Sequence, residues 1–173
     1  MNTIIVPEKI RGKDLVYPMG MCGTDRNGAS NPDMKNPIIK IGNTVDGKKV
    51  GGNLDAWNIP AINVTVGNGK YYTNLKAKID TGAYHNHINS EIAKQMLLDS
   101  TGSETHRTPY GKFELSVYRL FFGFEDIPNT HFVCDMRSVD FADVEMLIGM
   151  QFITEFCDLY IYGKENRFEL VFR

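Results

Sequence analysis

An alternating strand that ends on an acid is the feature that most constrains this chain. From residue 71 to residue 79, one face of the alternation is mainly apolar and the other mainly polar, which is typical of a half-buried β-strand. Residues 62–66 alternate in the same way, and Gly67-Asn68-Gly69 between the two runs supplies residues that readily adopt positive φ. The two runs therefore predict a β-hairpin whose second strand ends at Asp80.

The turn after this strand carries the sequence Asp80-Thr81-Gly82. A carboxylate there, followed by a small hydroxyl residue and a glycine, lies where another backbone or side chain can approach closely. The Thr81 hydroxyl can hydrogen-bond across that approach. A purely structural interpretation stays open, in which Asp80 caps the turn and Gly82 supplies a positive φ.

A second motif, well over sixty residues downstream, is an apolar run over 144–153 that enters a glycine and then a short helical stretch. The two motifs are Asp80-Thr81-Gly82-Ala83 and Leu147-Ile148-Gly149-Met150. Together they resemble the retropepsin-like aspartic peptidases, the single-domain family that includes retroviral proteases and their bacterial and cellular relatives. The resemblance covers residues 59–173. Viral members carry an acid and an arginine where this chain has Tyr84 and Met150, so the chain is more similar to the cellular branch.

The resemblance implies a mostly β fold, a small closed β-barrel of the acid-protease type with one or two short helices. One helix is expected near residues 90–97, where Asn89 and Ser90 provide a cap, and another after Gly149. The family places a flap hairpin where this chain has the run 108–112, which makes Tyr110 and Gly111 flap candidates. An ordinary hairpin turn explains Tyr110 and Gly111 equally well.

The activity that the resemblance implies is that of an aspartic endopeptidase with no metal and no organic cofactor. Its chemistry requires two carboxylates that share one proton, because like charges about 3 Å apart cannot both ionise without large cost. The chain has one copy of the motif, since Asp99 lacks a preceding alternating strand. The second carboxylate is therefore expected from Asp80 of a second subunit, in a two-fold homodimer that binds a peptide or protein substrate.

The remaining site residues take roles carried over from the family. Thr81, Gly82 and Ala83 are expected to support the active-site loop and contact the substrate backbone. Leu147, Ile148 and Gly149 are expected to support that loop from below.

Two other functions stay open. A retropepsin-fold binding module would keep the motif without cutting peptides. A metal-dependent hydrolase would use His85 and His87, whose spacing places both on one face of a strand, with further ligands from His106, His131 or a cysteine. No spacing selects those further ligands, and polar residues flanking a turn are the simplest interpretation of the two histidines.

Composition limits the remaining possibilities. A chain of 173 residues that is 42% hydrophobic can bury one core. The net charge of −2 and the pI near 6.1 provide no basic stripe, so no nucleic-acid partner is expected. Cys22, Cys134 and Cys157 are odd in number and widely spaced, which favours a reducing compartment. Neither a signal peptide nor a membrane span is indicated, so the expected location is the cytoplasm and no membrane partner is expected.

The two ends of the chain are predicted separately. Residues 1–56, with four of the seven prolines, are expected to form an irregular N-terminal arm or a pro-segment, with a possible small hairpin over 38–50, ahead of a protease domain at 57–173. Residues 159–172 predict a terminal hairpin around a turn at 163–166. Its apolar face, Phe168, Leu170 and Phe172, suits either the core or an interface.

Overall fold

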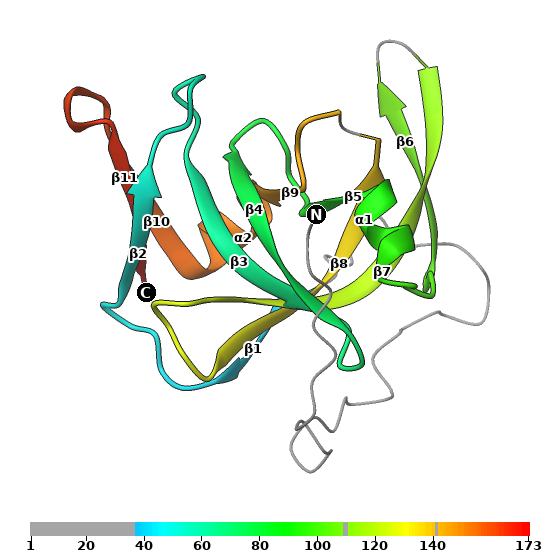
Figure 1. Ribbon diagram of the computed structural model, residues 1–173, viewed down its shortest axis with the longest axis horizontal. Helices are drawn as coiled ribbons and strands as arrows, with labels where there is room; N and C mark the ends of the chain where they lie inside the picture. The colour runs from blue at the N-terminus through cyan, green and yellow to red at the C-terminus, as the bar shows by residue number, and fades with distance from the viewer. Residues whose placement is uncertain (1–36, 109–110, 141) are drawn as a thin grey trace.

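The computed structural model describes residues 37–108, 111–140 and 142–173 (Figure 1). The elements of this part, in chain order, are β1 Ile39–Gly42, β2 Lys49–Asn53, β3 Ala61–Gly67, β4 Tyr72–Asp80, β5 His87–Asn89, α1 Ser90–Gln95, β6 Gly102–Thr108, β7 Gly111–Phe124, β8 Thr130–Val139, β9 Met146–Gly149, α2 Met150–Phe156, β10 Cys157–Tyr162, the 3₁₀ turn η1 Gly163–Glu165, and β11 Arg167–Phe172. Within these residues no helix has the length and apolar character needed to cross a membrane.

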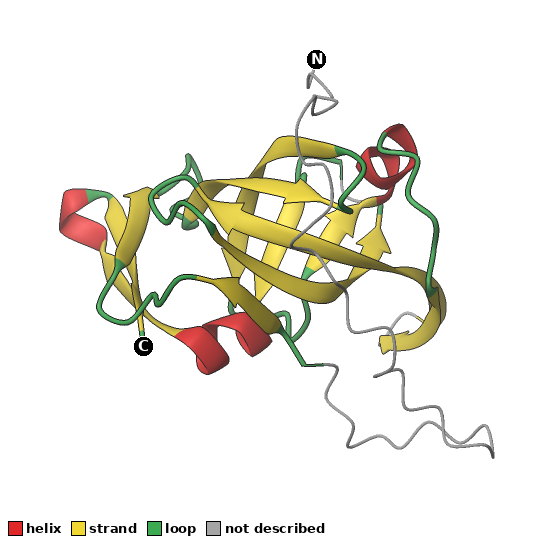
Figure 2. Cartoon of the chain, turned by 90° about the horizontal axis from the view of Figure 1, so that it is seen from below, coloured by secondary structure: helices red, strands yellow, loops and turns green. Residues whose placement is uncertain are grey.

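The strands form a closed barrel and a smaller sheet. The large sheet has the order β1-β8-β5-β9-β4-β3-β7-β6, and an additional pairing of β7 with β8 closes six of its strands into a barrel (Figure 2). The small sheet has the order β10-β11-β2 and lies at the left of the barrel in Figure 1, whereas the β6–β7 hairpin extends from its right side. The predicted mostly β closed barrel with two short helices is confirmed.

The hairpin that ends at Asp80 forms as its alternation predicts. β3 and β4 pair antiparallel, with Val64 opposite Leu75, and the inward face of β4 is buried. The Asn68 side chain accepts hydrogen bonds from two backbone N–H groups of the turn, and Gly69 has a φ of 89°. The turn residues therefore set the register that brings Asp80 to the end of β4.

A cluster of phenylalanine rings forms the centre of the core. The Phe152 ring, from α2, has its centroid 4.9 Å from that of Phe132 and 5.1 Å from that of Phe122, in edge-to-face geometry. Phe172 of β11 stacks on Phe132 with a centroid distance of 5.8 Å. Phe168 and Leu170 are also buried, so the apolar face of the terminal hairpin belongs to the core of its own chain.

β1 and β2, which begin within residues 38–50, do not pair with each other, so the small hairpin expected there is wrong. β1 pairs with β8 and β2 pairs with β11, and the segment between them crosses from one sheet to the other. Val45 and Val50 are buried in the shared core, and Gly47 N–H donates to the Phe172 carbonyl at 2.9 Å. Burial of these apolar residues against distant strands outweighs the local turn signal.

Residues 1–36 of the expected arm lie outside the described residues, and the division at residue 57 stays a prediction.

The end of α1 supplies a test of local strain. Leu97 N–H donates to the Lys94 carbonyl and Leu98 N–H to the Ala93 carbonyl, the pattern of a Schellman motif, and Leu97 has a φ of 51° with 71% of its surface exposed. We expect Leu97→Gly to raise the free energy of unfolding by about 0.5–1 kcal/mol, because glycine adopts this conformation without strain. Chemical denaturation measures the change. Leu98→Gly removes a side chain that packs on the core, so it should lower the free energy of unfolding.

Candidate active site

The Asp80 loop, residues 80–86, connects β4 to β5. Parallel pairing of β4 with β9 places Asp80 opposite Gly149. The Asp80 Oδ1 atom accepts a hydrogen bond from Gly82 N–H at 2.8 Å, and the Asp80 carbonyl accepts one from Ala83 N–H at 3.2 Å. Gly82 does not have a positive φ, so that part of the purely structural interpretation is wrong, whereas the cap of the turn by Asp80 is present. The turn holds one carboxylate oxygen and leaves Asp80 partly exposed.

Helix α2 anchors the middle of this loop. The Met150 N–H donates to the Ala83 carbonyl and the Gln151 N–H donates to the Tyr84 carbonyl, each at 2.8 Å. The first N–H groups of a helix have no partner within the helix, so the loop carbonyls satisfy two of them. Thr81 and Gly82 are exposed at the surface beside this junction, and Ala83 is half-buried.

Close packing beneath the loop depends on Gly149. A Cβ atom on this residue would lie 2.3 Å from the His85 carbonyl oxygen and 2.7 Å from the Tyr84 carbonyl oxygen. Leu147 and Ile148, in the same strand, are both buried, and Ile148 belongs to the core. The strand therefore supports the loop by contact with its backbone, and no side chain fits at position 149.

Asn86 is a site residue that the sequence interpretation missed. Its side chain is buried, its Oδ1 atom accepts from Gly149 N–H at 2.9 Å, and its Nδ2 group donates to Cys134 Sγ at 3.3 Å. The Asn86 carbonyl accepts from Arg137 N–H at 3.2 Å. One asparagine thus joins the loop to β8 and β9. Nothing in the sequence distinguishes it from a loop asparagine, because its partners are distant along the chain.

Asn86→Ala tests this role. We expect it to lower the free energy of unfolding by about 1–3 kcal/mol, because the Gly149 N–H loses its partner while buried. Chemical denaturation measures the loss. Asn63→Ala removes an exposed asparagine from β3 and is the matched control, with an expected change within about 0.5 kcal/mol. Equal effects of the two substitutions would contradict the role assigned to Asn86.

The other predicted residues are distributed as follows. Tyr110 lies outside the described residues. Gly111 begins β7 opposite Thr108, so a hairpin forms where the flap is expected, and its role as a flap stays a prediction. His131 lies against Phe121, with ring centroids 5.3 Å apart.

Three histidines come together beside the Asp80 loop. The ring centroids of His85 and His87 are each 6.3 Å from that of His106. The described residues nevertheless contain no group of three or more His, Cys, Asp or Glu side chains placed to hold a metal ion. The metal-dependent hydrolase therefore gains no support from the geometry.

Burial keeps two of these histidines neutral near pH 7. Burial, together with the Arg137 charge, lowers the pKa of His85, whose Nδ1 lies 3.3 Å from Gln151 Oε1. Burial, together with His106 and Arg137, lowers the pKa of His87 to about 4. A positive charge on either ring is unfavourable here because burial removes it from water and because the region already carries the Arg137 cation.

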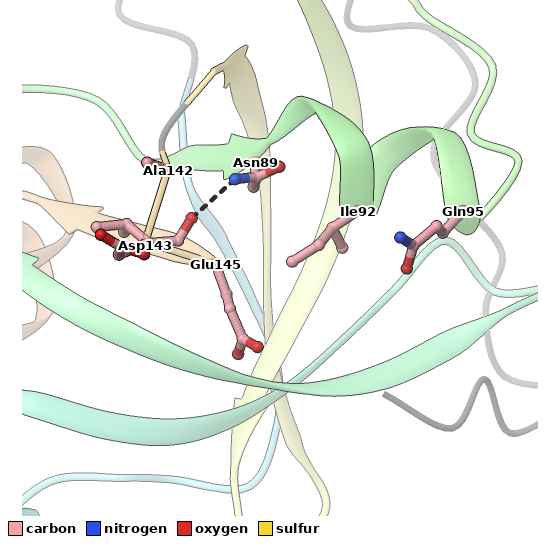
Figure 3. A pocket seen from close by; sticks show the side chains of 7 residues that line it. Asn89, Ile92, Gln95, Ala142, Asp143 and Glu145 are labelled. Carbon is pink, nitrogen blue, oxygen red and sulfur yellow. Dashed lines mark hydrogen bonds between the residues drawn. The ribbon is translucent and has the colours of Figure 1, made fainter. Parts of the chain in front are cut away.

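A cavity of about 620 Å³ lies apart from the Asp80 loop, between α1 and the segment before β9 (Figure 3). The Asn89 Nδ2 group donates to the Val144 carbonyl at 3.1 Å across one side of it. Its lining is Asn89, Ile92, Gln95, Ala142, Asp143, Val144 and Glu145. None of the residues that the sequence predicts for the site lines this cavity.

Comparison with known proteins identifies the architecture. The crystal structure of a retropepsin-like aspartic protease from Rickettsia conorii matches with a TM-score of 0.52 and 18% identity, over 80% of this chain and 96% of that chain. The chain has the retropepsin-like fold. The protease of EIAV, complexed with the inhibitor HBY-793, matches 58% of this chain and 90% of its own with 14% identity and a TM-score of 0.46. The retroviral protease-like domain of Ddi1 from Leishmania major matches 65% of this chain and 94% of its own with 15% identity and a TM-score of 0.42.

No family model and no curated protein matches the sequence. The retropepsin-like fold is therefore recognised from the backbone and from the two short motifs. Similarity of fold does not assign functional roles, so the roles of individual residues depend on the geometry and chemistry of the Asp80 loop.

Proposed function

We propose that this protein is an aspartic-type endopeptidase, in which two Asp80 carboxylates, one from each subunit of a homodimer, hydrolyse peptide bonds. The observation that carries the proposal is the position of Asp80: it ends β4 on a tight turn, opposite Gly149, in a barrel of the retropepsin-like fold. Asp99, in the similar sequence Asp99-Ser100-Thr101-Gly102, precedes β6 instead of ending a strand, so the described part of one chain supplies one carboxylate of this kind.

Two carboxylates across a two-fold axis provide both an acid and a base. At close range one proton is shared, because both groups cannot carry a negative charge together without large cost. The ionised carboxylate takes a proton from a water molecule, and the protonated carboxylate hydrogen-bonds to the carbonyl of the scissile bond. The water attacks that carbonyl directly, so no covalent intermediate forms with the enzyme.

The geometry of the loop suits this role. One oxygen of Asp80 is held by the Gly82 N–H, which orients the carboxylate, and Thr81 is exposed beside it where a partner subunit can be contacted. The exposed Gly82 and the half-buried Ala83 present backbone that a substrate can approach.

Cleavage of a diverse peptide library tests the proposal, measured from about pH 3.5 to 7.5 with and without a chelator, since the shared proton sets the active range. Sedimentation analysis of the same sample measures the oligomeric state. We expect cutting that resists the chelator and a dimer that forms at least in the presence of a substrate analogue. A folded protein that cuts nothing at any pH would instead indicate a binding module, and cutting that the chelator stops would indicate a metal-dependent hydrolase.

A further inference from the structure

An ion pair between a buried arginine and a partly exposed glutamate connects the β6–β7 hairpin to the body of the protein. The side chain of Arg137, on β8, is 3% exposed, and its Nε and Nη2 groups donate to the two carboxylate oxygens of Glu104 at 3.0 and 2.8 Å. Its Nη1 group donates to the Asp135 carbonyl, and its backbone N–H donates to Asn86 in the Asp80 loop. A bidentate pair of this kind is directional as well as strong, so Arg137 links β6, β8 and the loop in a defined geometry.

The three histidines surround this pair. His85 and His87 approach from the Asp80 loop and β5, and His106 lies two residues after Glu104 on the same face of β6. The His106 Nε2 atom is 3.8 Å from Glu104 Oε2. The junction therefore consists of three imidazoles, one guanidinium and one carboxylate.

The charges facing His85 and His87 come from a small set of neighbours. Arg137 on β8 and His106 on β6 disfavour a positive charge on either ring, Glu104 on β6 favours one on His85, and Gln151 on α2 contributes a polar group to His85. The next charged groups on β7 and β8, Arg119 and Asp135, form an ion pair with each other at 2.9 Å. Glu104 is thus the one anion among these neighbours that faces the histidine cluster, and it is already engaged by Arg137.

We infer that this junction fastens β6 to the Asp80 loop at neutral pH, and that acid releases β6 from the loop and from its pairing with β7. Neutral His85 and His87 pack beside the Arg137–Glu104 pair without repulsion, whereas protonated His85 and His87 repel each other and Arg137 and gain hydration when β6 moves away. The release itself is a property of the described residues. Only its consequence, that access to the Asp80 carboxylate widens as the pH falls, rests on the proposed function.

The direction of the pH dependence follows from proton linkage. A group with a lower pKa in the fastened state than in the open state binds more protons when open, so acid favours opening. For His87 the pH range over which this effect acts extends from the ordinary pKa of 6.5 down to the lowered pKa of about 4. The fastened state is fully favoured above about pH 6.5. As the pH falls through this window, the equilibrium constant between the fastened and the open state decreases about tenfold per pH unit for each such histidine.

Amide hydrogen exchange measures the release directly. The exchange of residues 102–106 is followed by mass spectrometry from about pH 7.5 to 4.5, after correction for the intrinsic pH dependence of exchange. Asp80→Asn protein is used, so that self-cleavage plays no part. We expect the protection of β6 to fall about a hundredfold or more over this range, while the core strand β11 stays protected.

Three substitutions assign the effect to the junction. His87→Gln should reduce the pH dependence of β6 exchange by about a hundredfold between pH 6.5 and 4.5, because one titrating group is removed. Glu104→Gln should raise the exchange of β6 already at pH 7.5, because the bidentate pair is lost. His131→Gln is the matched control, since burial also lowers the pKa of His131 but this residue lies against Phe121, away from the junction.

The outcomes separate this inference from the proposed function. Exchange of β6 that does not change with pH, that changes together with β11, or that responds to His131→Gln as strongly as to His87→Gln would overturn the inference. A protein that releases β6 in acid but never cuts a peptide would leave the inference standing and remove the proposed function. A protein that cuts peptides while β6 stays equally protected at every pH would support the proposed function and overturn the inference.

Discussion

Asp80→Asn is expected to lower the rate of peptide cleavage by about a thousandfold or more, since the amide can neither take a proton from water nor share one with its partner. Asparagine is nearly isosteric with aspartate, and its side-chain oxygen can still accept the hydrogen bond from Gly82 N–H. The fold and the dimer should therefore persist. Circular dichroism and sedimentation check both on the same sample on which cleavage is measured.

Mixing the two proteins tests whether each site requires two chains. After equilibration of equal amounts of wild-type and Asp80→Asn protein, about a quarter of randomly formed dimers contain two intact carboxylates, so the activity per wild-type chain should fall to about half. A larger excess of the variant should lower it further.

Two results would contradict the proposal. Wild-type activity that is unaffected by any excess of Asp80→Asn protein, under conditions where subunits exchange, would show that one chain suffices. Cleavage that survives Asp80→Asn would show that the reaction depends on another residue.

Gly149→Ala is expected to lower the free energy of unfolding by about 3 kcal/mol or more and to reduce the activity of the protein that still folds. The added methyl group would lie 2.3 Å from the His85 carbonyl oxygen, so the Asp80 loop must shift or β9 must separate from β4. The shift would also disturb the bond from Gly149 N–H to Asn86. Chemical denaturation measures stability, and the rate of peptide cleavage measures the second effect.

Gly163→Ala is the control for this substitution. Gly163 lies in η1 with no neighbouring atom within 4 Å of an added Cβ and without a positive φ, so its replacement should change stability by less than about 1 kcal/mol. Similar losses at positions 149 and 163 would indicate a general intolerance to glycine replacement and would contradict the close packing described for Gly149.

Local patterns in the sequence were sufficient to predict several elements of the barrel. The alternation over residues 62–79 and the turn at 67–69 predicted the β3–β4 hairpin and placed Asp80 at its end, because strand faces and turn geometry depend on neighbouring residues. Asn89 caps α1 as expected, accepting from Glu91 N–H at 2.9 Å. The paired motifs then predicted the fold that the structural comparison identifies.

Patterns of the same kind failed where the partner of a segment is distant along the chain. Residues 38–50 carry a turn signal, yet β1 and β2 pair with β8 and β11, because this pairing buries Val45 and Val50 in the shared core. Asn86 has the same explanation, since its three partners lie at positions 134, 137 and 149.

The sequence by itself determined the hairpin, the position of Asp80 on its turn and the glycine that ends β9, since each depends on the conformations open to a few consecutive residues. Only the tertiary structure decided that Gly149 lies under the His85 carbonyl, that Asn86 joins three segments, and that three histidines meet around Arg137 and Glu104. These contacts form between β4, β5, β6, β8 and β9 when the barrel closes. Their partners are separated by tens of residues, a distance at which no periodicity or turn signal acts.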